Sequence, residues 1–505
     1  MLKNLSRRKI IALFGGGAAL TLLAVVLRPL LHLGKTLSRE KKLTPVLPET
    51  EPTFINDARR LNRTEVKQVW KIPSDKEEAE TQLRELFQVA TKENHKISFA
   101  GQRHSMGGHV IYPNGIVVDA LPFNHLELDE SKSLLTAGAG ARWQEILPYL
   151  DARGYSVTIM QSNHDFSVGG SLSVNCHGWQ TGMSPISSSV DSLRIMLADG
   201  SILRCSRSEN SELFSLALGG YGLFGFILDA TLKVVKNQNY VFRSFQQNTK
   251  QYLSAFEKNV GGNPDVQMAY GRLCVDTRDF LQDSLLNVLT VDRSKILHLS
   301  DEPSTSSENV ARLILRGSVG SEYGKRLRWD AETGKYLDLQ PKGPISRNRI
   351  LHEPVALYQE KAAGVTDILH EYFVPRGKLE DFLVPLRKII PTFKGDLLNV
   401  TIRDVNTDRD SFLNYAREDV FGLVMLFNYP ATTQADRAME EMTKVMIDAV
   451  LSMGGTYYLP YRLHASEGQF SRAYPRAREF FTFKRKYDPN ALFQNRFYQK
   501  YYLRF

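Results

Sequence analysis

Cysteine is scarce in this chain: the 505 residues contain three, Cys176, Cys205 and Cys274, far apart and odd in number. Such a set excludes a disulfide framework as the basis of the fold, and no spacing typical of a structural zinc site is present. The composition, with 42% hydrophobic and 24% charged residues, is that of an ordinary globular protein. A chain of this length exceeds what one hydrophobic core holds, so we expect more than one domain. From the cysteine pattern we expect no metal site.

The body of the chain also lacks an excess of charge of either sign. The formal net charge is +9, but residues 1–42 carry nine basic residues and one acid, Glu40. The rest of the chain is therefore nearly neutral and lacks the basic surface that binding to nucleic acid requires. We expect no nucleic-acid partner.

The longest apolar run stands at the N-terminus. Arg7 and Arg8 precede an uncharged, largely apolar run from Ile10 to Leu27, about 27 Å long as a helix and borderline for crossing a bilayer. Paired arginines before such a run are similar to a twin-arginine export signal. No clear small-residue cleavage site follows, which favours an uncleaved membrane anchor over a cleaved signal.

The basic residues before this run indicate that the N-terminus stays in the cytoplasm and that the body is exported, periplasmic or extracytoplasmic. We expect a signal or transmembrane helix within residues 1–34 and a linker over residues 35–63, rich in proline after residue 43. An amphipathic helix docked on the fold is the alternative to the anchor.

Two glycine-rich loops follow strand-like apolar runs. The first spans residues 100–108, Ala-Gly-Gln-Arg-His-Ser-Met-Gly-Gly, and the second spans residues 167–178. Glycine lets backbone N–H groups approach a ligand closely, and clustered N–H groups bind phosphate oxygens. Two such loops predict a cofactor diphosphate that is held from two sides.

The chain resembles the FAD-binding domain of the vanillyl-alcohol oxidase or p-cresol methylhydroxylase-type flavoproteins. The resemblance runs in order through these two loops and residues 190–200, 219–227 and 487–493, and it is nearest to the alditol and aldonolactone oxidases. The resemblance implies an α+β fold with FAD as cofactor. It places a two-lobed FAD-binding domain at residues 64–240 and a substrate domain, an antiparallel sheet covered by helices, at residues 241–465. Residues 466–505 would return to complete the FAD site.

Apolar periodicity predicts the main elements. Strands are expected at residues 66–70, 96–100, 115–119, 134–138, 397–403 and 421–427, and helices at residues 74–94, 142–153, 378–390 and 433–452. Ser74 is the expected N-cap of the first helix. The polar residues 300–350 are expected to form a mobile insertion.

The resemblance also implies the cofactor-binding residues. They are Gly101, Gln102, Arg103, His104, Ser105, Met106, Ser167, Val168, Gly169, Gly170, Ser171, Asn175, Cys176, His177, Gly178, Gly225, Phe226, Ile227 and Asn495. The N–H groups of residues 168–171 would face the diphosphate, residues 225–227 the adenine, and either Asn495 or Arg496 the flavin pyrimidine. In the family a histidine placed as His104 is can bond covalently to the 8α carbon of the flavin. The alternative is a histidine that only hydrogen-bonds within its loop.

Catalysis needs a proton acceptor and a group that stabilises the developing alkoxide. Relatives carry a Glu-x-Arg pair on a strand of the substrate domain; here Arg403 keeps the cation and Thr401 replaces the glutamate. His464 is the predicted base, with Tyr458 and Tyr461 beside it in the sequence, although a structural histidine is an equal alternative. Glu371 is interpreted as part of a strand, not as a catalytic group.

The resemblance therefore implies an FAD-dependent oxidoreductase. It would oxidise a CH–OH group of a polyol, sugar lactone or related alcohol by hydride transfer to flavin N5, with dioxygen as acceptor. One alternative is a dehydrogenase or reductase of the same fold that uses a quinone, a cytochrome or a lipid-linked sugar. The alternative of another class is a cofactor-free binding protein.

Overall fold

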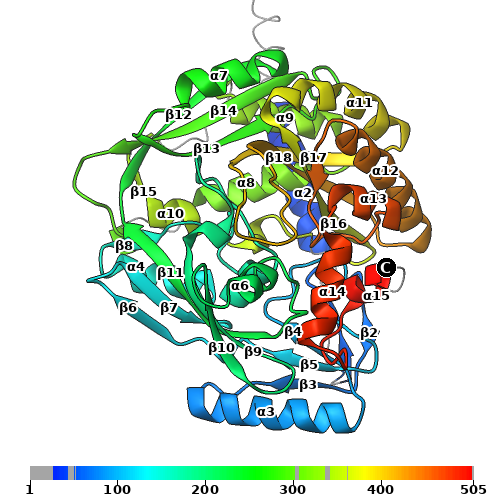
Figure 1. Ribbon diagram of the computed structural model, residues 1–505. Helices are drawn as coiled ribbons and strands as arrows, with labels where there is room; N and C mark the ends of the chain where they lie inside the picture. The colour runs from blue at the N-terminus through cyan, green and yellow to red at the C-terminus, as the bar shows by residue number, and fades with distance from the viewer. Residues whose placement is uncertain are drawn as a thin grey trace, which may run out of the picture.

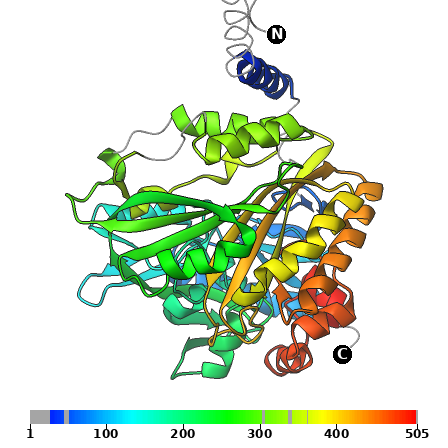
Figure 2. The ribbon, with the colours of Figure 1, turned by 90° about the horizontal axis from the view of Figure 1, so that it is seen from above.

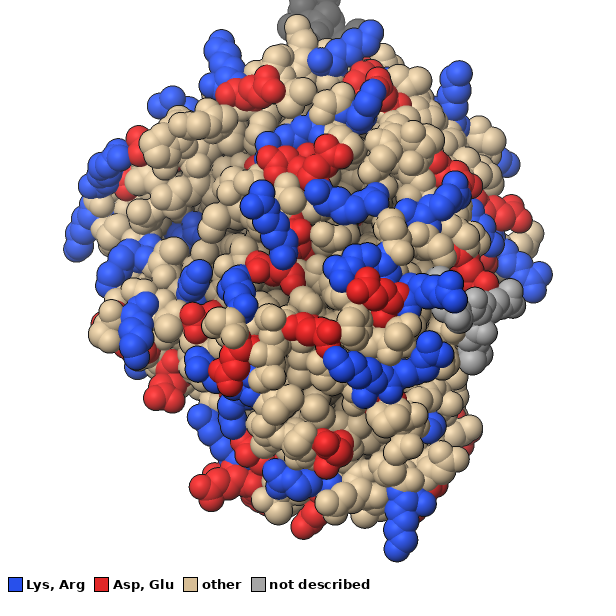
Figure 3. Space-filling model, in the orientation of Figure 1, with Lys and Arg blue, Asp and Glu red and all other residues tan. Residues whose placement is uncertain are grey.

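The computed structural model describes residues 27–43, 51, 53–301, 306–335, 342–360 and 362–502. All of the N-terminal apolar run except Leu27, and most of the proline-rich part of the expected linker, lie outside the described residues. Within the described ranges no helix is both long and apolar enough to cross a membrane. Basic and acidic side chains are interspersed over the face that Figure 3 shows, in keeping with the nearly neutral body.

The first part of the FAD-binding domain is a small parallel sheet. Strands β3 (Gln68–Lys71) and β4 (Ile97–Ala100) both pair with β5 (Ile116–Asp119), and helix α3 (Lys76–Lys92) is the crossover between β3 and β4. The helix begins after Asp75, whose carboxylate accepts hydrogen bonds from the N–H groups of Glu77 and Glu78. The predicted cap at Ser74 was one residue early, because the carboxylate of Asp75 meets those N–H groups.

The second part is a sheet in the order β10-β9-β11-β7-β6, with β8 paired to β11. Its strands are β6 (Leu126–Asp129), β7 (Leu134–Gly138), β8 (Tyr155–Val157), β9 (Val190–Met196), β10 (Ile202–Ser206) and β11 (Phe226–Lys236). Three helices accompany them: α4 (Trp143–Asp151), α5 (Val168–Ser173) and α6 (Ser211–Ala217). The second glycine loop begins at α5 and thus lies between β8 and β9.

The substrate domain is built on an eight-stranded sheet in the order β15-β12-β14-β13-β17-β18-β16-β19, and all its pairs are antiparallel, as predicted. The strands are β12 (Asn239–Asn248), β13 (Val266–Leu273), β14 (Asp283–Asp292), β15 (Ile345–Ser346), β16 (Val365–Pro375), β17 (Asp396–Val405), β18 (Val420–Pro430) and β19 (Thr456–Tyr457).

Helices cover one face of this sheet (Figure 1): α7 (Tyr252–Asn259), α11 (Leu379–Thr392) and α12 (Thr433–Leu451). Tyr252 of α7 packs edge-on against Phe421 of β18, and Phe382 of α11 packs against Tyr372 of β16. Side chains alternate along a strand, so the residues next to these, Glu371 among them, point to the opposite face. That opposite face turns toward the FAD-binding domain.

Three described helices, from segments that were expected to be anchor, linker and mobile insertion, form a layer. Helix α2 (Arg28–Lys42) crosses the expected boundary at residue 34 and packs beside α8 (Ser306–Gly317) and α9 (Glu322–Glu332), as Figure 2 shows for α2 and α8. His32 Nε2 lies 2.9 Å from the carbonyl oxygen of Gly317, and Arg312 pairs with Glu40 at 2.9 Å. Residues 300–350 were predicted to be mobile from their polar composition, but α8 and α9 form there and make specific polar contacts.

The C-terminal residues return to the FAD-binding domain. After α13 (Glu467–Ala473) and α14 (Ala477–Tyr487), Phe493 forms a parallel bridge with Ile97 of β4, and α15 (Arg496–Tyr501) follows. The turn between α14 and this bridge is built around Asp488, which accepts hydrogen bonds from the N–H groups of Leu492 and Phe493, both at 2.8 Å. Asp488 also pairs with Lys484, and neither side chain is exposed.

Asp488→Ala is expected to destabilise the protein strongly, because it leaves the Lys484 ammonium buried without its partner. The expected loss is about 3–5 kcal/mol in the free energy of unfolding, measured by urea or thermal denaturation. Asp448→Ala is the matched control, since its pair with Arg472 is more than half exposed and is worth at most about 1 kcal/mol. Equal losses for the two variants would contradict a structural role for the buried pair.

Candidate active site

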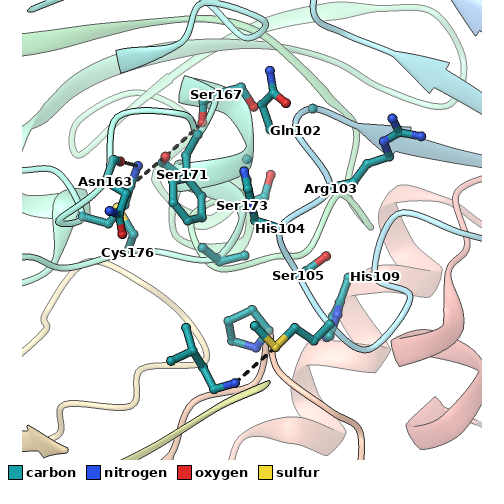
Figure 4. A pocket seen from close by; sticks show the side chains of 18 of the residues that line it. Gln102, Arg103, His104, Ser105, His109, Asn163, Ser167, Ser171, Ser173 and Cys176 are labelled. Atoms are coloured by element: carbon teal, nitrogen blue, oxygen red, sulfur yellow. Dashed lines mark hydrogen bonds between the residues drawn. The ribbon is translucent and has the colours of Figure 1, made fainter. Parts of the chain in front are cut away.

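A long cavity lies between the FAD-binding domain and the uncovered face of the eight-stranded sheet. Both glycine loops line it, and so do side chains of β13, β16, β17 and β18. Figure 4 shows the first loop, with Gln102 to Ser105, facing the segment that carries Ser167, Ser171 and Ser173. The two loops therefore approach one cavity from opposite sides, as the sequence predicted.

The first loop leaves its backbone donors unused. The N–H groups of Gln102 to Ser105 donate to no group among the described residues, and all four residues line the cavity. A side chain at Gly101 would place its Cβ 2.0 Å from the Ser167 hydroxyl, so the two loops approach each other closely at this glycine. Free N–H groups beside a polar cavity suit the oxygens of the FAD diphosphate.

The second loop uses most of its backbone donors internally. The N–H groups of Val168, Gly169 and Ser171 donate to the carbonyl oxygens of Ala141, Ala139 and Ser167, at 2.8–2.9 Å. The prediction that these N–H groups face the diphosphate is therefore wrong, because they start α5 and tie it to the adjacent strand end. Of residues 168–171 only Gly170 keeps an N–H group without an acceptor among the described residues. Ser167, Gly169, Gly170 and Ser171 still line the cavity, whereas Val168 does not.

His104 stands at the cavity with its ring on Phe166, the centroids 4.4 Å apart. Burial and then the positive charge of Arg59 lower the pKa of His104 to about 4. The imidazole is therefore neutral at physiological pH, which keeps one ring nitrogen available as a nucleophile. Arg59 was not predicted as a site residue; it comes from the segment before the first strand of the domain, lines the cavity and is 8% exposed.

Three predicted cofactor residues are structural. The Asn175 amide donates to Asp408 at 2.9 Å and accepts from the Ser187 N–H group, and Asn495 caps α15 and donates to the carbonyl oxygen of Tyr221. Neither lines the cavity, and neither does Gly178. Asn175 and Asn495 satisfy buried backbone groups instead of a ligand, because buried amides must find partners.

The remaining cofactor predictions do reach the cavity: Met106, Cys176, His177, Gly225, Phe226 and Ile227 line it, as do Gly101 and Gln102 to Ser105. Burial raises the pKa of the Cys176 thiol to about 12. A thiol with so high a pKa is not a nucleophile at neutral pH, so Cys176 is a packing residue at the cavity wall.

Of the four predicted catalytic residues, Arg403, Tyr458 and Tyr461 line the cavity and His464 does not. Arg403 donates to the carbonyl oxygen of His177 at 3.2 Å and to the Ser162 hydroxyl at 2.9 Å. His464 lies behind the sheet, where Nδ1 is 2.9 Å from the Thr443 hydroxyl. The sequence could not decide between a cavity residue and a structural residue for His464. A side chain just after the end of a strand can turn to either face of the sheet.

Glu371 lies in strand β16, as the sequence indicated, and its place in the cavity wall was not predicted. Its carboxylate lies 2.6 Å from His177 Nε2, and both side chains are almost fully buried. Arg272 and Glu353 also line the cavity and were not predicted. No local pattern marks Glu371 or Arg272, because each owes its position to pairing between distant strands.

Comparison with known proteins agrees with this arrangement. Residues 77–206 match a family model described as an FAD binding domain. The chain is 21% identical to L-gulonolactone oxidase of Mus musculus over 439 residues, which cover 83% of this chain and 92% of that protein.

Other relatives match over a shorter part. Mitochondrial L-galactono-1,4-lactone dehydrogenase of Arabidopsis thaliana is 27% identical over 188 residues, 36% of this chain and 31% of the relative. Cytokinin dehydrogenase 2 of the same plant is 30% identical over 153 residues, 30% of each chain. The glycine loops, the fold and these similarities show that the chain is an FAD-dependent oxidoreductase, and it is similar to the aldonolactone oxidases and dehydrogenases.

Proposed function

We propose that the protein oxidises a CH–OH group of a sugar lactone, polyol or related alcohol, with dioxygen as the electron acceptor. The observation that carries the proposal is the polar face of the sheet, where Arg272, Thr401, Arg403 and Glu371 line the cavity that the free N–H groups of the first loop also line. A face of donors and acceptors beside a flavin site suits a substrate with several hydroxyl groups. The names of the mouse and plant relatives favour a lactone among these substrates.

FAD, when bound, supplies the two-electron acceptor for the substrate hydride. Arg403 is the residue that we expect to orient the substrate oxygen, because its Nε has no partner among the described residues while its other nitrogens are held by two hydrogen bonds. A fixed guanidinium stabilises negative charge on that oxygen as its proton leaves.

Mixing the FAD-loaded protein with L-gulonolactone, L-galactono-1,4-lactone or an alditol without oxygen should bleach the visible flavin absorbance. Arg403→Ala should slow this bleaching by about 10²–10³-fold while FAD content is kept. Rapid recovery of colour in air supports the oxidase; slow recovery in air with rapid recovery on adding a quinone or cytochrome c supports the dehydrogenase alternative. If no alcohol or lactone bleaches the flavin, the lipid-linked sugar alternative replaces the proposal.

Covalent attachment of FAD through His104 is a further part of the proposal. It is supported by the neutral imidazole of His104 and by its fixed position against Phe166 at the cavity wall. In the net reaction a C–N bond replaces the methyl C–H bond of the flavin and the imidazole N–H bond. Dioxygen accepts both hydrogens and becomes hydrogen peroxide.

Acid precipitation tests this attachment. The flavin colour of the wild-type protein should stay in the pellet, and His104→Ala should release it into the supernatant. His95→Ala, at a surface histidine paired with Glu93, is the control and should keep colour in the pellet. Release of flavin from the acid-treated wild-type protein would leave His104 as a loop residue beside non-covalent FAD.

We also propose that the protein is exported and held at the membrane by its N-terminal residues. Arg7, Arg8 and the apolar run after them support this localisation. The paired leucines Leu30 and Leu31 of α2, 61% and 57% exposed, continue the apolar character into the described residues.

Expression of the full-length chain in a bacterium with twin-arginine export tests this localisation. The protein should sediment with membranes and be digested by protease added outside the inner membrane. The variant with Arg7→Lys and Arg8→Lys should be protected from that protease. A wild-type chain found in the cytoplasmic supernatant would contradict the localisation.

A further inference from the structure

The proposed oxidation needs a proton acceptor that the sequence did not place. His464 lies outside the cavity, with Nε2 3.6 Å from Asp436 and Nδ1 against Thr443. The glutamate of the Glu-x-Arg pair is also missing, because Thr401 occupies that position. A proton that leaves the substrate hydroxyl must therefore reach another group of the cavity wall.

The strand register supplies a carboxylate on the same face as Thr401. Arg272 of β13 is the partner of Thr401 in β17, Thr401 is the partner of Val424 in β18, and Val424 is the partner of Glu371 in β16. Residues directly opposite one another in neighbouring strands point to the same face of a sheet. All four line the cavity. Glu371 thus lies in one row with Thr401, two strands away, a distance of about 10 Å between backbones.

Two neighbours contact the Glu371 carboxylate, one on each oxygen. The Tyr461 hydroxyl donates to Glu371 Oε2 at 3.0 Å, and His177 Nε2 lies 2.6 Å from Oε1. The Glu371 side chain is 1% exposed, whereas Tyr461 is partly exposed and lines the cavity. Tyr461 is therefore the less buried of these two hydrogen-bonded residues of the cavity wall.

The charge state of these groups suits proton transfer in that direction. Burial raises the pKa of Glu371, but His177, Arg403 and the Tyr461 hydrogen bond together outweigh burial and hold the pKa below its ordinary value. Burial and then the charge of Glu371 raise the pKa of Tyr461 well above its ordinary value. At neutral pH the pair is therefore a carboxylate that accepts a hydrogen bond from an intact phenol.

We propose that Glu371 accepts the proton of the substrate hydroxyl through Tyr461, with His177 positioning the carboxylate. The inference rests on the proposed alcohol oxidation. The substrate O–H proton passes to the Tyr461 oxygen, and the proton of Tyr461 passes to Glu371 Oε2. FAD, when bound, would accept the hydride that the substrate carbon loses as its C–O bond becomes C=O.

Glu371→Gln and Tyr461→Phe test this relay, because each removes proton transfer with little change in volume. The rate of flavin reduction by substrate, measured anaerobically by stopped flow, should fall by about 10²–10⁴-fold in each. Residues that act as a unit are not additive, so the double variant should be no slower than the slower single variant. FAD content and the reduction potential of the flavin should match the wild-type values, which excludes a general disturbance of the site.

The pH profile gives a second readout. The charged or titratable groups that interact with Glu371 are His177, Arg403, Tyr415, Tyr458, Tyr461 and Tyr474. Since the carboxylate must be ionised to accept a proton, the wild-type rate should stay level near neutral pH and fall only in acid, below the ordinary pKa of glutamate. Glu371→Gln should lose this acid limb.

His464→Asn is the control and should keep the wild-type rate, because its amide can replace the bond to Thr443 outside the cavity. If substrate reduces the wild-type flavin and Glu371→Gln equally fast, the relay is wrong while the proposed function stands. If no alcohol reduces the wild-type flavin, the relay and the proposed alcohol oxidation are both wrong. Should Glu371→Gln fail to bind FAD, Tyr461→Phe decides, since an unchanged rate in that variant overturns the relay.

Discussion

The cavity depends on a buried polar seam between the second glycine loop and the substrate domain. Residues 174–182 meet the substrate domain through hydrogen bonds rather than through apolar packing alone. Asn175 donates to Asp408, Thr181 donates to Asp404 at 2.7 Å, and Tyr415 donates to the carbonyl oxygen of Asn175 at 2.7 Å. A buried polar group without a partner is costly, so each contact restricts where the two domains can meet.

His177 lies at the centre of this seam. Its ring contacts Glu371, and its carbonyl oxygen accepts a hydrogen bond from Arg403, so one residue of the FAD-binding domain positions two charged residues of the substrate domain. Buried charges are poor sources of stability but strong determinants of geometry, because only a narrow range of positions pairs them. The orientation of Glu371 and Arg403 toward the cavity follows from this pairing.

The two walls of the cavity contribute different groups, backbone N–H groups from the loop and side chains from the sheet, because their backbones differ. The first glycine loop offers free N–H groups because it is neither helix nor strand, and so its donors are left for a ligand. The sheet uses backbone groups for pairing between its strands and contributes side chains to the cavity. Its covered face forms the core with α7, α11 and α12, which leaves alternate side chains for chemistry.

The local features of the chain could be predicted from its residues. Periodicity marked the strands and helices near residues 97, 116, 379 and 433, the glycine loops predicted the two sides of the FAD site, and the charge of residues 1–42 separated the N-terminus from a nearly neutral body. These features depend on neighbours within a few residues, so the chain encodes them directly.

Which polar side chains face the cavity depends on contacts between distant parts of the chain, and these could not be predicted. Asn175 and Asn495 have ligand-like side chains but satisfy buried backbone and carboxylate groups, and His464 pairs with Thr443 behind the sheet. Glu371 and Arg272 are more than 90 residues apart in the sequence and share a row only because β13, β17, β18 and β16 pair in one register. Register between distant strands is set by the packing of the whole sheet, and a shift of one residue would turn each side chain to the other face.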